Sequence, residues 1–231
     1  MSIRRIVALC FVFWIAATAA AFVASPHGGS GERRSFTLTA TAPAAGADTL
    51  TLVLPGGYHT VEVKAAAPGA PDAVEVTVSG RVGNGLAILS KPLPALENIA
   101  VDTRTAGGTL TVGLTRADTT VIRTNWTITV PARFGAHVTA DAGSVRFTGL
   151  EGPLTGRVDV GAVRADVASH HGPADLDAVV GRVSVSGNGL GGRRPRGEAG
   201  PGAHWDFPAA GSGGPPISLH VSVGSAALRV R

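Results

Sequence analysis

The chain has 231 residues, of which 44% are apolar, 16% charged and 5% aromatic, and it contains 32 glycines. This composition is too apolar for a disordered protein, and the length allows one sizeable core or two small ones. The formal net charge of +4 falls to +2 without Arg4 and Arg5 of the N-terminal leader, which excludes the charge pattern of a nucleic-acid-binding protein.

Residues 1–24 have the features of a signal peptide. Arg4 and Arg5 precede an uncharged apolar run, residues 6–24, in which Ala19-Ala20-Ala21 supplies small residues suited to cleavage. The same run is long enough to remain as a signal anchor, so two locations stay open: a periplasmic, envelope or secreted protein, or an ectodomain held by one membrane span. Cys10 lies in this leader, so the mature chain has no thiol for a disulfide, a metal or catalysis.

After a Gly/Ser-containing linker, residues 25–35, the segment 36–131 alternates apolar and polar residues between Gly- and Pro-rich breaks. This alternation predicts β-strands with one face toward a core and one toward water. We expect antiparallel strands in a sheet or sandwich, with Trp126 in the core. The strands are expected at FTLTATA from Phe36, TLTLVLP from Thr49, HTVEVKA from His59, AVEVTVSG from Ala73, GTLTVGL from Gly108 and TNWTITVP from Thr124.

From residue 132 to 231 a glycine followed two residues later by an apolar residue returns at an even spacing. Gly143, Gly161 and Gly181 are 18 and 20 residues apart, and Gly224 follows 43 residues later, at about two periods. Such a repeat predicts a short β-solenoid of three to four rungs, in which glycine turns a corner that other residues avoid.

The rungs should share one dry interior, because a single rung cannot bury its own apolar face. We expect Val145, Val163 and Val183 to stack in one inward column. A Gly/Pro-rich insertion, residues 187–216, interrupts the repeats. The predicted fold is therefore all-β, with an N-terminal antiparallel region running into a solenoid.

The stretch from Thr124 to Val185 resembles the bacterial "putative adhesin" family, also called the toast-rack β-strand repeat family. The resemblance rests on Val130-Pro131, on Gly143-Ser144-Val145 and on the link Gly149-Leu150-Glu151-Gly152-Pro153-Leu154. It implies a folded envelope or surface domain of unassigned function without catalytic residues to transfer. The chain departs from the family in lacking Asp after the repeat glycine and in its long insertion.

His170 and His171, near Asp175 and Asp177, are the most metal-like group in the sequence. Adjacent residues on a strand point to opposite faces, and HHGPAD has the composition of an exposed turn. We therefore expect a turn, with metal binding as the alternative.

Asp141, Asp159 and Asp166 recur along the repeats in a way that resembles carboxylates of β-helical polysaccharide hydrolases. The repeat array is short for such an enzyme, and an aspartate beside a turn glycine is usually structural. The sequence predicts no enzyme and no cofactor.

The insertion contains the remaining candidates, which are Arg193, Arg194, Arg196, Trp205 and Phe207. Arginines and aromatics in a loop suit contact with a glycan or protein partner, whereas a segment folded over the last rung would protect an open sheet edge. The sequence thus predicts a non-catalytic, exported surface module with an adhesin-like or scaffold role and an envelope or surface partner. The alternatives are a small polysaccharide-active or metal-binding protein and a membrane-anchored ectodomain.

Overall fold

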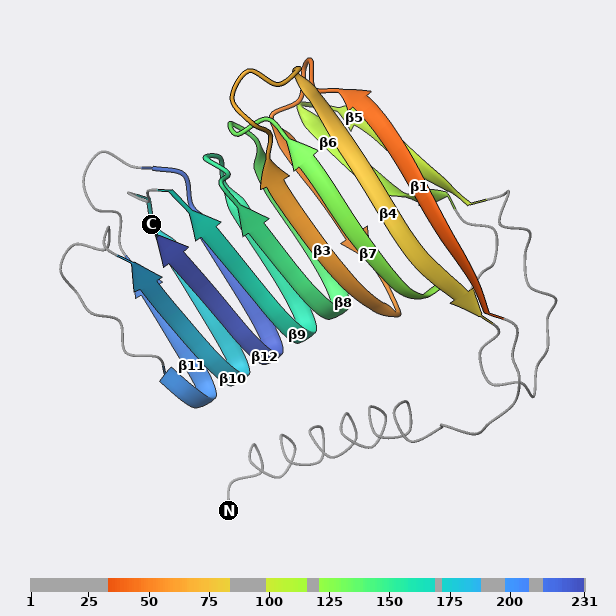
Figure 1. Cartoon of the computed structure of the whole chain (residues 1–231). Coiled ribbons are helices and arrows are strands. Elements are labelled where there is room, and N and C mark those ends of the chain that lie inside the picture. Colours follow the sequence, from red (N-terminus) through yellow and green to blue (C-terminus); the bar gives the residue numbers. More distant parts are fainter. Residues whose placement is uncertain are drawn as a thin grey trace.

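A computed structural model describes residues 33–83, 99–115, 121–168, 172–187, 198–207 and 214–230. Within these residues the chain forms twelve strands and no helix, as Figure 1 shows, which confirms the all-β prediction. No apolar helix of membrane-crossing length therefore occurs in the described ranges. The strands are β1 (Arg33–Pro43), β2 (Thr49–Leu54), β3 (Tyr58–Ala65), β4 (Ala73–Gly83), β5 (Ala100–Ala106), β6 (Thr109–Thr115), β7 (Val121–Val130), β8 (Gly135–Thr148), β9 (Leu154–Val167), β10 (Ala174–Gly187), β11 (Glu198–Phe207) and β12 (Ile217–Val230).

The strands make two layers that are joined along one side by bent strands (Figure 1). The front sheet runs β1-β4-β7-β3 and continues through the second halves of β8, β9, β12 and β10. The back sheet runs β5-β6-β2 and continues through the first halves of the same long strands. The register of β8 shows the crossing, because residues 135–140 pair with β2 whereas residues 143–148 pair with β3.

A glycine stands at the bend of each long strand. The φ angles are 133° at Gly143, 144° at Gly161, 142° at Gly224 and 151° at Gly181, a region that side-chain-bearing residues rarely adopt. The same glycines touch one another through the stack. A Cβ on Gly161 would lie 1.8 Å from the Gly143 carbonyl oxygen, and a Cβ on Gly224 would lie 1.7 Å from that of Gly161. Glycine is therefore required here both by the backbone angle and by the close approach of the layers.

The long strands are parallel and in register, but their spatial order is β8-β9-β12-β10. Val145 lies opposite Val163, and Ala226 of β12 lies between Val163 and Val183; all four side chains are buried. Part of the insertion explains this order. It forms β11, which pairs antiparallel with β10 on the outer side, so that β12 pairs with the other side of β10, next to β9.

The N-terminal strands pair in both directions. β1-β4-β7 and β5-β6 are antiparallel, as expected, but β2 and β3 are parallel to their neighbours in both sheets. β2 and β3 together form a layer like β8, in which the residues 55–57 (Pro-Gly-Gly) take the place of the bend. The parallel pairs were not part of the prediction, because a short Pro-Gly-Gly turn between alternating strands is equally typical of a hairpin.

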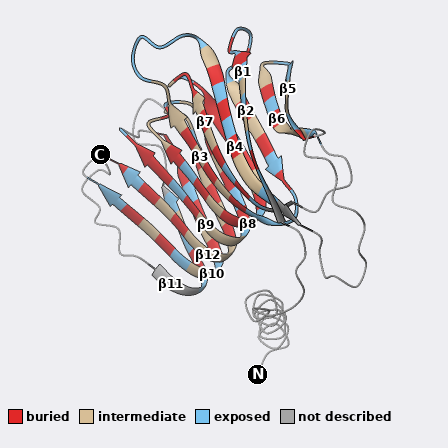
Figure 2. Ribbon diagram, turned by 45° about the vertical axis from the view of Figure 1, so that its right-hand side comes forward, coloured by how far each residue is buried: buried red, intermediate tan, exposed pale blue. Residues whose placement is uncertain are grey.

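One apolar core fills the space between the sheets and continues from the N-terminal strands into the repeats. Buried and exposed residues alternate along the strands, as Figure 2 shows. Trp126 is 1% exposed, in agreement with its predicted core position. Each large apolar side chain buried in this way contributes about 1.5–3 kcal/mol. Other large members of the core are Phe134, Phe147, Leu50, Leu110 and Ile128.

Candidate functional site

The outward side chains of the front sheet form a polar surface, which we name the front face. Residues opposite one another in register lie on the same face of a sheet, so this surface follows from the pairing and from the buried alternate positions. Hydroxyl and amide groups dominate it toward β1, and Tyr58 is 45% exposed there. The small polar residues are Ser35, Thr37, Thr39, Thr41, Thr77, Ser79, Asn125, Thr127, Thr129 and Thr60.

The two outer faces carry opposite charge. On the front face the basic residues Lys64, Arg81, Arg123, Arg146, Arg164, Arg182 and Arg229 outnumber the acidic Glu62, Glu75 and Asp166. On the outer side of the back sheet the acidic Asp102, Asp175, Asp177 and Asp206 outnumber the basic Arg104 and Arg157. The molecule therefore has a basic surface on one side, although the net charge of the whole chain is small.

Asp166 joins two arginines on the front face, near the end of β9. Arg146 donates from Nε and Nη2 to Asp166 Oδ2 at 3.0 and 2.7 Å, and Arg164 donates from Nε to Oδ1 at 2.9 Å. The Asp166 side chain is only 1% exposed, whereas those of Arg146 and Arg164 are 48% and 44% exposed. The carboxylate thus lies beneath two guanidinium groups that still reach solvent. We name these three residues the arginine clamp.

The protonation of Asp166 is set by this arrangement. Burial by itself raises the pKa of the carboxyl, but the hydrogen bonds and charges of Arg164 and Arg146 outweigh it and hold the pKa below its ordinary value. Asp166 is therefore ionised in the folded protein at neutral pH. Two cations and one anion leave the clamp with a net positive charge.

The outer side of the back sheet has a cluster of histidines and aspartates at β10, β11 and β12. His220 Nδ1 lies 2.9 Å from Asp177 Oδ2, and His204 Nδ1 lies 3.5 Å from Asp175 Oδ1. Asp175 and Asp177, which the metal-binding alternative combined with His170 and His171, thus lie beside His204 and His220. The described ranges contain no group of three His, Cys, Asp or Glu residues placed to hold a metal ion.

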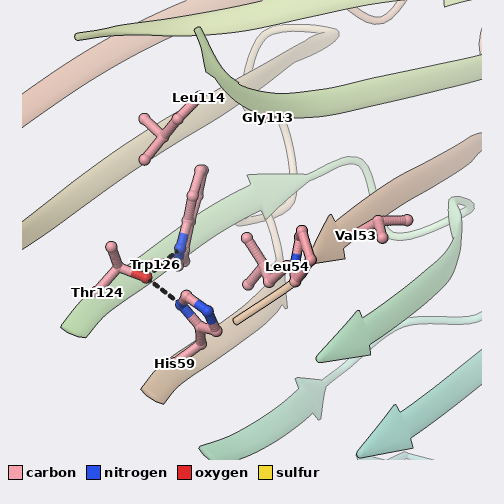
Figure 3. Close-up of a pocket in the computed structure, with 8 residues that line it drawn as sticks. Val53, Leu54, His59, Gly113, Leu114, Thr124 and Trp126 are labelled. Carbon is pink, nitrogen blue, oxygen red and sulfur yellow. Dashed lines mark hydrogen bonds between the residues drawn. The ribbon is translucent and has the colours of Figure 1, made fainter. Parts of the chain in front are cut away.

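A pocket of about 260 Å³ lies between the sheets where β2 ends and β7 begins. Figure 3 shows its polar wall, where His59 Nδ1 and Trp126 Nε1 both meet Thr124 Oγ1, each at 2.7 Å. His59 Nε2 meets the carbonyl oxygen of Gly56. The remaining wall is mostly apolar and includes Val53, which is 54% exposed.

These contacts fix the hydrogens of the pocket. A carbonyl oxygen only accepts, so His59 Nε2 donates to Gly56, and neutral His59 accepts at Nδ1 from the Thr124 hydroxyl. Thr124 in turn accepts from Trp126 Nε1. Both ring nitrogens of His59 are engaged inside the protein, so the arrangement stabilises the fold rather than moving a proton. The front face is therefore the stronger candidate for a functional surface.

His59 should make the fold sensitive to mild acid. Burial lowers its pKa, while the Gly56 carbonyl and the charge of Asp141, which accepts a hydrogen bond from Gly56 N–H at 2.7 Å, partly oppose this effect. Below about pH 6.5 the unfolded chain takes up a proton at His59 that the folded chain does not, so stability decreases. Urea unfolding at pH 7.5 and 5.5, chosen as roughly one unit on either side of that value, should show a larger decrease for the wild type than for His59→Gln. Equal decreases would contradict the assignment.

Several residues singled out from the sequence lie outside the described ranges, namely His170, His171, Arg193, Arg194 and Arg196. Their roles stay predictions.

Trp205, expected in the insertion, lies in β11 opposite Leu176 and packs half-buried against the core. Phe207 ends the same strand, opposite Ala174. The segment 198–207 therefore covers the outer edge of β10, the capping arrangement that the sequence offered as one alternative.

Of the three aspartates in the polysaccharide hypothesis, Asp141 and Asp159 occupy equivalent positions on adjacent strands, and Asp166 lies apart from them. Asp141 and Asp159 stand near the bends of adjacent layers, where Asp141 accepts from Gly56 and Asp159 lies 3.8 Å from Arg157 Nε. Asp166 lies on the front face within the clamp. The clamp arginines were missed in the sequence, although Gly-x-Val-Arg recurs at 143–146 and 161–164 and could have indicated them.

No family model and no curated protein matches the chain. Solved structures similar to it include a "putative cell adhesion protein" of Clostridium sporogenes, which is 10% identical with a TM-score of 0.46, over 86% of this chain and 100% of that one. A "putative adhesin" of Parabacteroides merdae is 10% identical with a TM-score of 0.32, over 62% and 61% of the two chains. A "putative adhesin" of Bacteroides fragilis is 10% identical with a TM-score of 0.29, over 85% and 97%. Two of these three structures are described with the same words, "putative adhesin", as the family that the stretch from Thr124 to Val185 resembles.

Proposed function

We propose that this chain is an exported, non-catalytic surface module that attaches to an envelope or surface partner, an adhesin-like role. The front face is the observation that carries the proposal. It combines rows of hydroxyl groups, an excess of arginine and lysine, and the exposed Tyr58 on a sheet whose other side is packed into the core. Such a preformed surface binds without the ordering cost that a mobile loop pays.

Export follows in this proposal from the leader, residues 1–24, which lies outside the described ranges. The back sheet supports a non-catalytic role indirectly, because Asp102, Asp175 and Asp177 each lie beside an arginine or histidine, namely Arg104, His204 and His220. In this proposal the module recognises its partner through the shape and charge of its surface.

The first test is location and attachment. We expect the full chain, expressed with its own leader in a bacterial host, to appear outside the cytoplasm. Intact mass will show whether the leader is removed. The recovered protein should bind saturably to bacterial envelopes or to members of a glycan array containing neutral and charged sugars. Retention in the cytoplasm, or export without attachment to any of these surfaces, would contradict the proposed function.

A further inference from the structure

We propose that the arginine clamp binds the carboxylate groups of an acidic polysaccharide. This inference rests on the surface role proposed above and names the chemistry of the partner. Arg146 uses Nε and Nη2, and Arg164 uses Nε, to hold Asp166. Outside these contacts, Nη1 of Arg146 and both terminal nitrogens of Arg164 are left for an acceptor above the face.

The clamp is preorganised for such an acceptor. A free arginine side chain loses about 2 kcal/mol of rotamer entropy when it is fixed. Here Asp166 already holds both guanidinium groups, so that cost is met when the protein folds. The two exposed, planar donors match the geometry of a carboxylate, which arginine binds through paired N–H groups. Arg229, which faces Asp166 across the β9-β12 register, adds positive charge beside the clamp.

The surroundings of the clamp favour a sugar polymer over a membrane. Val53, Tyr58 and Val179 are the large apolar side chains exposed in the described ranges, and of these only Tyr58 lies on the front face. A surface that inserts into a membrane presents an apolar band to the lipid, and this face has none in its described part. Hydroxyl rows instead offer donors and acceptors to sugar hydroxyls. The Tyr58 ring, with the Arg123 guanidinium 5.5 Å from its centre, offers an aromatic surface.

The clamp has further basic residues on the neighbouring strands of the front face. Basic residues occur on successive strands of the front face, with Arg146 on β8, Arg164 on β9, Arg229 on β12 and Arg182 on β10. Neighbouring strands are about 4.8 Å apart. In register Arg146 lies opposite Arg164, whereas Arg229 lies two residues beyond their level and Arg182 two residues before it. A chain of acidic sugars that crosses the strands would therefore meet Arg146 and Arg164 side by side, with the other two arginines displaced to either side of its path. Charge complementarity makes the front face, and not the acidic back face, the side that binds.

The test measures binding of the full chain to immobilised polygalacturonate, with neutral dextran and phosphatidylglycerol vesicles as comparison surfaces. We expect polygalacturonate to bind and the affinity to fall as salt is raised, because the contacts are charged and exposed. Arg164→Gln should weaken binding about tenfold, which corresponds to the loss of one charge-assisted hydrogen bond. Arg157→Gln is the matched control, because Arg157 lies on the same strand, β9, but on the outer side of the back sheet and is 61% exposed. Its affinity should stay unchanged.

Arg229→Gln provides a second variant that leaves the Asp166 contacts intact, in case Arg164→Gln loses stability. The inference is overturned if Arg157→Gln weakens binding as much as Arg164→Gln and Arg229→Gln do. It is also overturned if vesicles are bound in preference to polygalacturonate, or if polygalacturonate is not bound while envelopes or neutral glycans are. In the last case the proposed surface role stands and only the partner chemistry fails. Loss of attachment to every surface would instead remove the proposed function itself.

Discussion

Replacing Gly161 with alanine is expected to lower the free energy of unfolding by about 3–5 kcal/mol. The backbone angle at Gly161, 144°, is strained for a residue with a side chain. The added Cβ would also lie 1.8 Å from the carbonyl oxygen of Gly143. The clash is relieved only if β8 and β9 move apart at the bend. Because each of these strands belongs to the front and the back sheet, the separation weakens the β8–β9 hydrogen bonds in both sheets.

Gly113→Ala is the matched control for this prediction. Gly113 also stands in a strand, β6, but a Cβ there has nothing within 4 Å. Its replacement should change the free energy of unfolding by less than about 1 kcal/mol, in either direction. Urea unfolding followed by far-ultraviolet circular dichroism compares the two variants. Similar losses at Gly113 and Gly161 would mean that the close approach of the layers does not limit the fold.

The repeat glycines explain why the all-β fold could be predicted from the sequence. Local chemistry determines each bend, since only glycine combines the φ angle of Gly143 or Gly224 with a neighbouring backbone in contact. The same holds for the alternation in β2, where Leu50 and Leu52 are buried and Thr51 is not. Patterns of this kind indicate which side of a strand faces the core and where the strand bends.

The order of the layers could not be predicted in the same way. Parallel layers with Gly-x-Val or Gly-x-Ala at the bend have nearly the same inward surface, so Val163 can accept either Val183 or Ala226 as its neighbour. The choice depends on β11, which covers the outer side of β10 and comes from a Gly/Pro-rich segment with weak strand propensity. Pairing with the existing edge of β10 outweighs that propensity.

The candidate surface could not be predicted from the sequence either, because it depends on which strands pair. Asp166 was noticed as one of three aspartates near turns, but its partners Arg146 and Arg164 become adjacent only when β8 and β9 pair in register. His59 likewise gave no signal beyond an inward position on a strand. Its contact with Thr124 depends on the parallel pairing of β3 and β7, which the sequence did not indicate.

Asp166→Ala is expected to lower the free energy of unfolding by about 2–3 kcal/mol at neutral pH. The change removes three charge-assisted hydrogen bonds and leaves Arg146 and Arg164 side by side without their shared anion. The loss stays below that of a fully buried ion pair, because both arginine side chains are nearly half-exposed and can turn toward water.

The pH dependence separates the charge of Asp166 from its packing. Its pKa is lowered in the folded protein, so the unfolded chain takes up the proton first as the pH falls below about 4. The carboxylate therefore stabilises the wild type fully above that pH, and this contribution is lost as the pH falls further through the folded-state pKa. Urea unfolding at about pH 7 and about pH 3, on either side of the ordinary carboxyl pKa, should show the gap between wild type and Asp166→Ala closing in acid. A gap of constant size would mean that the volume of the side chain, and not its charge, holds the two arginines on the front face.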